Sequence, residues 1–88
     1  MEFDLHRPYQ LNPAVALRPE PFGALAYHFG NRRLSFLKTP QLVTVVRLLE
    51  SQASAAAALN AAGVSVRERA RYAAALAALA NSEVIDER

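Results

Sequence analysis

The sequence contains no cysteine, no tryptophan and a single methionine. Without cysteine, the chain has no disulfides, thiolate metal sites, iron–sulfur clusters or cysteine nucleophiles. No apolar run approaches the length of a membrane span, and the acidic start MEFDLHRP lacks the features of a signal peptide. We therefore expect a cytoplasmic protein without a membrane segment that does no redox chemistry by itself.

Residues suited to catalysis are also scarce. The two histidines, His6 and His28, lie far apart in the sequence, and the carboxylates gather near the two ends. Neither a metal-ligand spacing nor a glycine-rich phosphate loop occurs. We expect no enzyme activity, no cofactor and no metal site.

The length and charge limit the possible partners. Eighty-eight residues form one domain around a single core, here residues 1–88, in which 1–13 read as an extended N-terminal arm broken by two prolines. Hydrophobic residues make up 52% of the chain, but many of them are alanines. The net charge of +2 admits an acidic partner and is too small to require nucleic acid.

A β-hairpin is predicted around Gly30-Asn31, because a glycine can take the positive φ that a two-residue turn needs. Continuing the register pairs Tyr27 with Leu34 and Leu25 with Phe36, so that these four large side chains share one face, which we expect to join the core. The opposite, more polar face carries Ala26, His28, Arg33 and Ser35, and we expect His28 to be a solvated strand residue there. A further strand over 14–18 precedes the hairpin and ends at the prolines that follow it.

Three helices are predicted after the hairpin. Thr39-Pro40 begins a helix that runs to about Ser51, and Ser54 caps a second one that ends at Gly63. The third extends over 65–80, where a serine and Glu68 fit a capping box. Its larger residues form a stripe toward the core, with a smooth second stripe beside it at Ala70, Ala74 and Ala78.

The edge of the hairpin indicates peptide binding. If the strands lie in chain order, 32–38 is an edge strand without proline, to which an extended peptide could add as another strand. The smooth alanine stripe would form the other wall, and Arg33, Arg67 and Arg71 would favour an acidic peptide. The residues alone leave open whether this edge is free, is covered by the N-terminal arm, or makes a homodimer.

DNA binding is the main alternative. The stretch LNAAGVS followed by the third helix is similar to the turn of a helix-turn-helix unit, with the hairpin as a wing. However, Arg69 occupies a position that is normally buried and apolar in that motif, and only three arginines could read bases. A solvated helix face with Glu68 as local counter-charge is the simpler interpretation of Arg67, Arg69 and Arg71.

The succession VALRPEPFGALAYHF, RRLSFLKTPQLVTVVRLL and YAAALAALANSEVID resembles the PqqD-type fold, the recognition element of ribosomally made, enzyme-modified peptides. More closely, it resembles the family of mycofactocin biosynthesis chaperones (MftB-like). The resemblance implies an α+β, winged-helix-like domain in which a three-stranded antiparallel sheet is followed by three helices.

The resemblance also implies a non-catalytic peptide chaperone. It places the leader of a precursor peptide as a fourth strand beside the third one, in a cleft against the third helix. Carried onto this chain, the cleft consists of Arg33, Leu34, Ser35, Phe36, Leu37, Arg67, Arg71, Ala74 and Ala78. The implied second partner is a radical S-adenosylmethionine (SAM) enzyme that modifies the bound precursor.

Overall fold

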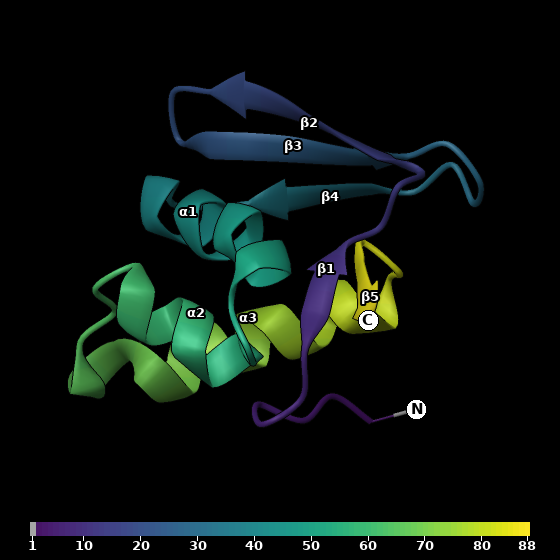
Figure 1. Ribbon diagram of the computed structural model, residues 1–88. Helices are drawn as coiled ribbons and strands as arrows, with labels where there is room; N and C mark the ends of the chain where they lie inside the picture. The colour runs from purple at the N-terminus through teal and green to yellow at the C-terminus, as the bar shows by residue number, and fades with distance from the viewer. Residues whose placement is uncertain (1) are drawn as a thin grey trace.

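The computed structural model describes residues 2–88, and Met1 lies outside the described part. In chain order the elements are β1 (Tyr9–Leu11), β2 (Val15–Glu20), β3 (Gly23–His28), β4 (Leu34–Leu37), α1 (Pro40–Leu48), the 3-10 turn η1 (Leu49–Ser51), α2 (Ala55–Ala61), the 3-10 turn η2 (Val66–Glu68), α3 (Arg69–Asn81) and β5 (Ile85–Glu87). Strands β2, β3 and β4 form an antiparallel sheet in that order, and all three helices lie on one side of it (Figure 1). The predicted α+β fold, three strands followed by three helices, is confirmed.

The hairpin has the predicted register but a different turn. Tyr27 pairs with Leu34 and Leu25 with Phe36, as the sequence indicated. The His28 N–H donates to the carbonyl oxygen of residue 33 at 3.0 Å, so the loop spans four residues, 29–32, rather than two. Its positive φ of 62° falls on Arg32 and not on Gly30.

His28 organises this loop from inside the protein. Its side chain is only 6% exposed, which corrects the expectation of a solvated histidine. Nδ1 accepts hydrogen bonds from the backbone N–H groups of Gly30 at 3.0 Å and Asn31 at 3.1 Å. A Cβ on Gly30 would lie 2.8 Å from the imidazole Cε1, so glycine is needed here for the close approach of the ring and not for its φ.

The two faces of the sheet are sorted as predicted, but the wrong face was assigned to the core. Ala24, Ala26 and Leu37 are at most 1% exposed and face α1, whereas Leu34 and Phe36 are each 55% exposed on the outer face. Small side chains on the inner face allow α1 to pack close to the sheet. The fully buried large side chains come chiefly from the helices, the tail and the end of β4: Leu37, Val45, Val46, Leu49, Leu59, Leu76, Val84 and Ile85.

Strand β2 continues past its predicted end at residue 18, through Pro19 to Glu20. The Phe29 N–H donates to the Ala14 carbonyl, which fixes the alternation of hydrogen bonds between β2 and β3. By that alternation, the backbone nitrogen of residue 19 points away from β3. Proline is therefore tolerated because this position has no hydrogen bond to give up.

Two of the three predicted N-terminal caps are present at the starts of their helices. Thr39 Oγ1 accepts a hydrogen bond from the Leu42 N–H at 3.0 Å, and Ser54 Oγ accepts one from Ala57 at 3.1 Å. The capping box predicted at Ser65 is wrong, because its side chain makes no capping bond and the first turn is the 3-10 turn η2. The Glu68 carboxylate pairs with Arg71 instead of returning to the cap.

The N-terminal arm is fixed to the body of the domain, where β1 pairs with β5 in a separate two-stranded sheet. Carbonyl oxygens of Leu5 and Arg7 accept the N–H groups of residues 56 and 55 at 2.9 and 3.0 Å, which satisfies donors that the first turn of α2 leaves free. The Phe3 ring lies 4.8 Å from that of Tyr9, which is 4% exposed. The strand of the arm therefore pairs with β5 and not with β4.

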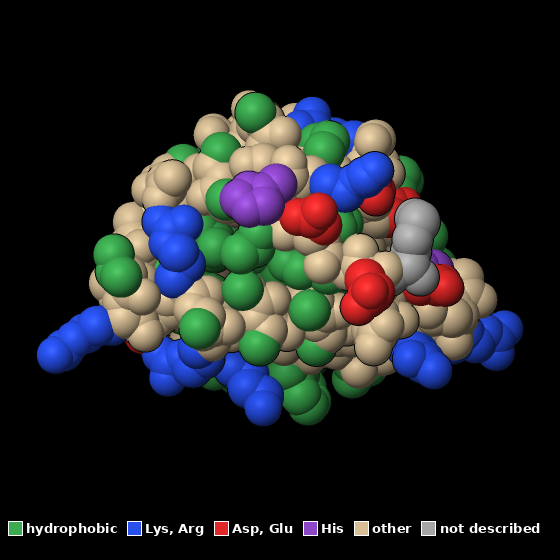
Figure 2. Space-filling model, turned by 90° about the horizontal axis from the view of Figure 1, so that it is seen from below, with side chains coloured by type: hydrophobic (Ala, Val, Ile, Leu, Met, Phe, Trp, Pro, Cys, Tyr) green, Lys and Arg blue, Asp and Glu red, His purple; other side chains and the backbone are tan. Residues whose placement is uncertain are grey.

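Seen from the side opposite the sheet, hydrophobic side chains gather in the middle of the surface and lysine and arginine side chains lie at its margins (Figure 2). This agrees with the many partly buried alanines of α2 and α3. None of the helices formed by residues 2–88 has the length and apolar character needed to cross a lipid bilayer.

Candidate functional site: an open sheet edge beside an apolar groove

The outer edge of β4 presents backbone groups that are not used within the sheet. Because the His28 N–H donates to the Arg33 carbonyl, the hydrogen-bonded pairs along the ladder involve Ser35 and Leu37. The N–H and C=O groups of Leu34 and Phe36 therefore point away from β3. Among residues 2–88, none donates to or accepts from these four groups.

The two edges of the sheet differ. On β2, Pro19 occupies a position whose nitrogen faces outward, and this interrupts any ladder that another strand could form there. On β4, no proline lies between residue 32 and Thr39. Since the N-terminal arm pairs with β5, it does not cover β4 either. Strand addition is thus possible at one edge of the sheet, the edge that faces α3.

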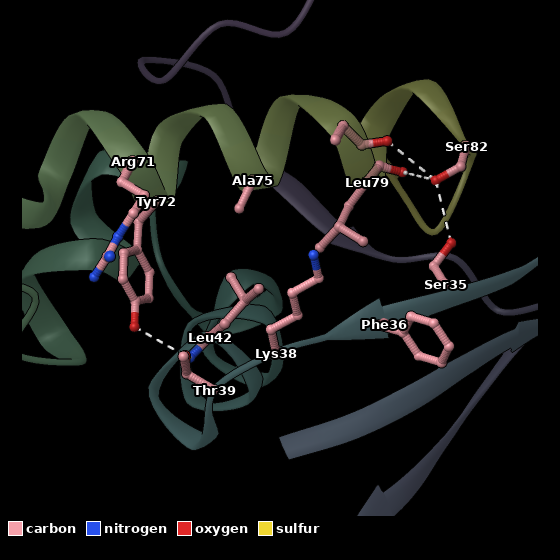
Figure 3. A pocket seen from close by; sticks show the side chains of 11 residues that line it. Ser35, Phe36, Lys38, Thr39, Leu42, Arg71, Tyr72, Ala75, Leu79 and Ser82 are labelled. Carbon is pink, nitrogen blue, oxygen red and sulfur yellow. Dashed lines mark hydrogen bonds between the residues drawn. The ribbon is translucent and has the colours of Figure 1, made fainter. Parts of the chain in front are cut away.

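A groove of about 540 Å³ lies between β4 and α3 (Figure 3). It is lined by Ser35, Phe36, Lys38, Thr39, Leu42, Arg71, Tyr72, Ala75, Ala78, Leu79 and Ser82. Arg71, Ala75, Ala78 and Ser82 recur at four-, three- and four-residue intervals, so they form one line along the helix. The short side chains in the middle of this line leave room between the helix and the strand.

Two polar contacts join the walls of the groove at its ends. At one end, Thr39 Oγ1 and Tyr72 Oη share a hydrogen bond of 2.8 Å, which links the start of α1 to α3. At the other end, the Ser35 and Ser82 hydroxyls lie 3.5 Å apart. The Ser82 hydroxyl also donates to the Ala78 carbonyl at 3.0 Å, so Ser35 supplies the proton between the two serines. The groove is thus bounded by a short hydrogen bond at one end and by a pair of neighbouring hydroxyl groups at the other.

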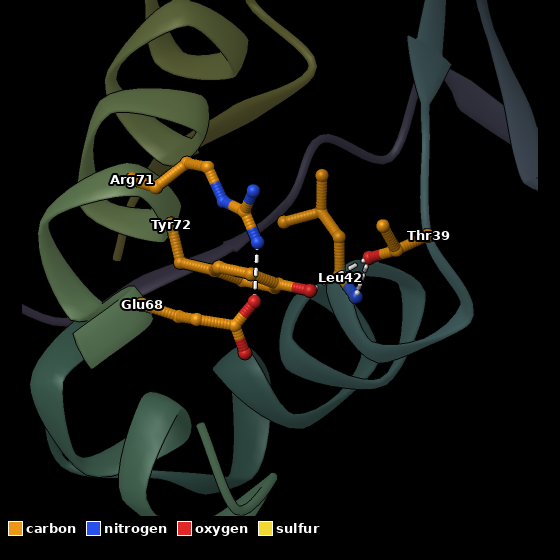
Figure 4. A network of polar contacts seen from close by, with 5 residues as sticks. All are labelled: Thr39, Leu42, Glu68, Arg71 and Tyr72. Atoms are coloured by element: carbon orange, nitrogen blue, oxygen red, sulfur yellow. Dashed lines mark hydrogen bonds and ion pairs between the residues drawn. The ribbon is translucent and has the colours of Figure 1, made fainter. Parts of the chain in front are cut away.

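The charged side chains of the groove are both cationic. Arg71 pairs with Glu68, and its guanidinium carbon lies 6.0 Å from the centroid of the Tyr72 ring (Figure 4). Lys38 extends from the end of β4 toward Leu79 and takes part in none of the ion pairs formed among residues 2–88 (Figure 3). Because Arg71 already has a local carboxylate, Lys38 is the cation better placed to meet an acidic ligand.

The structure brings together some of the site residues named from the sequence and separates others. Ser35, Phe36, Arg71 and Ala78 line the groove. The rest lie around it or in the core: Arg33 is exposed just before β4, Leu34 faces the outer side of the sheet, Leu37 is fully buried, Arg67 is exposed in η2, and Ala74 is exposed on α3.

Several lining residues were not named from the sequence. Tyr72 and Leu79 belong to the stripe that was expected to face the core. Both side chains are buried there, and one side of each also lines the groove. Lys38 and Thr39 follow directly after β4; from the sequence, Lys38 was expected at the end of the edge strand and Thr39 only as the cap of α1. The contribution of Ser82 carries no local signal, because it depends on how the end of α3 meets β4.

An unpaired sheet edge beside an apolar groove with a helical wall is the geometry of domains that bind an extended peptide by strand addition. Main-chain groups of such an edge hold the peptide, and the groove selects its side chains. The arrangement contains no cluster of acidic or histidine side chains suited to a metal among residues 2–88.

Residues 8–86 match the peptide chaperone MftB family. The peptide chaperone MftB of Mycobacterium ulcerans (strain Agy99) is 49% identical over 83 residues, which cover 94% of this chain and 76% of the relative. That of Mycobacterium tuberculosis (strain ATCC 25618 / H37Rv) is 46% identical over 87 residues, covering 99% and 80%. That of Mycolicibacterium smegmatis (strain ATCC 700084 / mc(2)155) is 48% identical over 83 residues, covering 94% and 81%. No solved structure is significantly similar to the chain.

The chain therefore belongs to the peptide chaperone MftB family. As a member of a family of chaperones it is a non-catalytic protein, which agrees with the expectation of no enzyme activity.

Proposed function

We propose that this protein is the peptide chaperone of mycofactocin biosynthesis, and that it binds the leader of a ribosomally made precursor peptide as an added strand along β4. The observation that carries the proposal is the unpaired outer edge of β4, where Leu34 and Phe36 present their N–H and C=O groups beside the groove. The names of the relatives support a peptide as the ligand.

The bound leader lies between β4 and α3. Its backbone continues the sheet, and the side chains that face inward enter the apolar part of the groove, near Ala75 and Ala78. Lys38 and Arg71 favour an acidic leader. The proposed site thus keeps Ser35, Phe36, Arg71 and Ala78 from the residues named above and adds the lining residues that the structure places with them.

The presentation step rests on the resemblance to the mycofactocin chaperones. In this step the protein holds the leader of the precursor and presents it to a radical SAM maturation enzyme, which modifies the other end of the precursor. The cytoplasm, where ribosomally made precursors are available, is the proposed site of action. Sedimentation of the chaperone, precursor and enzyme together should give a ternary complex, and a mixture without precursor serves as the control.

Strand addition is tested with backbone N-methylated precursor peptides. Each methyl group removes one N–H, and only every second N–H of an added strand points toward β4. We expect affinity to fall with a period of two along the bound segment. Equal losses at all positions, or none, would contradict strand addition.

The position of the leader is tested by following backbone amide signals by NMR during titration with the precursor. Shifts concentrated over 32–38 and along α3 are expected. A flat titration in which the protein sediments as a dimer would show that a second copy occupies the edge. A gel-shift experiment with mixed duplexes at moderate salt tests DNA binding, and we expect no shift.

A further inference from the structure

The outer face of the sheet exposes more large apolar side chains than a fully solvated face requires. Leu34 and Phe36 are each 55% exposed and Phe22 is 43% exposed. The Phe22 ring contacts that of Phe36 edge-on, with centroids 6.1 Å apart. Contiguous exposed apolar clusters are typical of surfaces that another molecule covers.

Strand β4 contributes to this face and to the groove in alternation. Leu34 and Phe36 lie on the outer face, whereas Ser35 points toward Ser82 and the groove (Figure 3). Paired residues of neighbouring strands share a face in either strand direction. In a strand added to β4, the residues opposite Leu34 and Phe36 therefore lie on the outer face, and the residue between them enters the groove.

All three of these ligand positions meet apolar surroundings. The two outer residues lie against the exposed side chains of Leu34 and Phe36. The inner residue starts beside Ser35 and extends into the groove, whose apolar lining includes Ala75, Ala78 and Leu79. An ordinary surface strand would instead alternate, with apolar residues toward the groove and polar ones toward solvent.

We infer that β4 selects the ligand on both faces, so that the bound segment contains three consecutive apolar residues, with Leu34 and Phe36 as specificity-determining residues for the two outer ones. This inference rests on the proposed strand addition and adds to it the chemical class of the recognised segment.

A second copy of this chain fits the edge less well. If two β4 strands paired antiparallel around a two-fold axis, the residue opposite Ser35 would be Ser35, Arg33 or the fully buried Leu37 of the other copy, depending on whether the axis passes at residue 35, 34 or 36. None of these registers places a large, free apolar side chain opposite Ser35. A serine hydroxymethyl group leaves most of a groove of about 540 Å³ unfilled. The geometry thus favours a different peptide with a large apolar side chain at this position.

The experiment is a selection of 12-residue peptides from a displayed random library on the intact protein, in parallel with Phe36→Ser and Leu34→Ser. Both variants keep the backbone groups of the edge and replace side chains that are already more than half exposed. We expect peptides with three adjacent apolar residues on the wild type. On each variant, one outer position should lose its apolar preference while the inner position keeps it.

The best wild-type peptide is then synthesised with aspartate at each of the three positions. We expect at least a tenfold loss of affinity at every one. Aspartate tolerated at both outer positions, or an unchanged preference on Phe36→Ser, would overturn the inference.

Binding of the same peptide to Leu34→Pro separates this failure from that of the proposed function. If proline weakens binding far more than Leu34→Ala does while the outer positions accept aspartate, strand addition holds and the two-faced selection is wrong. If the peptide binds equally to the proline variant, both strand addition and two-faced selection are wrong. The same holds if no peptide is enriched and the protein sediments as a dimer that the proline disrupts.

Discussion

Replacing Leu34 by proline should remove one outward backbone donor from β4 while leaving the sheet intact. The hydrogen bonds from β4 to β3 are made by Ser35 and Leu37, so the nitrogen of residue 34 takes no part in them. The Leu34 side chain is 55% exposed, and its loss should cost little stability. Leu34→Ala is the matched control, because it removes the side chain and keeps the N–H.

The magnitude follows from the groups left unpaired. Removing the donor leaves a ligand carbonyl without a partner, which costs about 1–3 kcal/mol. A loss of about 2 kcal/mol corresponds to roughly a thirtyfold higher Kd. Leu34→Ala loses one cross-strand side-chain pair, which is worth about 0.2–1 kcal/mol, or at most roughly fivefold.

Isothermal titration calorimetry with the precursor peptide measures both affinities, and urea unfolding shows whether the variants remain folded. Ser35→Pro provides a contrast, because its N–H faces β3 and its loss should lower the free energy of unfolding. If Leu34→Pro is folded and binds the precursor as tightly as Leu34→Ala does, the peptide does not pair with this edge.

Three further changes test the groove, the loop and the core. Lys38→Glu should weaken binding of an acidic leader by about 1 kcal/mol at low salt, roughly fivefold in Kd, and by less at high salt. The control Arg67→Glu lies outside the groove and should have a smaller effect. If titrations at two salt concentrations show equal effects of the two substitutions, Lys38 has no specific role. Gly30→Ala should lower the free energy of unfolding by about 1–3 kcal/mol, because its Cβ would lie 2.8 Å from His28, and an unchanged urea midpoint would contradict this packing. Leu37→Ala should cost about 2–5 kcal/mol of stability in the same assay, since the side chain is fully buried, and a loss below about 1 kcal/mol would be inconsistent with a core position.

Much of the local structure could be predicted because its signals lie within a few residues. Thr39-Pro40 and Ser54 begin their helices as expected, since a hydroxyl cap and a proline in the first turn act on neighbouring backbone groups. The hairpin register, with Tyr27 opposite Leu34, follows from the lengths of two adjacent runs. These features depend little on how the rest of the chain is packed.

The sequence by itself therefore determined the order and type of the elements, the pairing of β3 with β4, and a peptide-binding edge on β4 as one of several alternatives. The assignment of the large side chains to the core was wrong because period-two alternation defines two faces without saying which one a helix covers. Only the packing of α1 against Ala24 and Ala26 decides this, and it leaves Leu34 and Phe36 outside.

The tertiary structure also decided what no local pattern contains. The pairing of β1 with β5 joins the two ends of the chain and leaves the edge of β4 uncovered. The line on α3 that faces the groove is fixed by contacts between distant residues, Thr39 with Tyr72 and Ser35 with Ser82. Such contacts form only when the whole core is assembled, because the rotation of a helix about its axis depends on every surface packed against it.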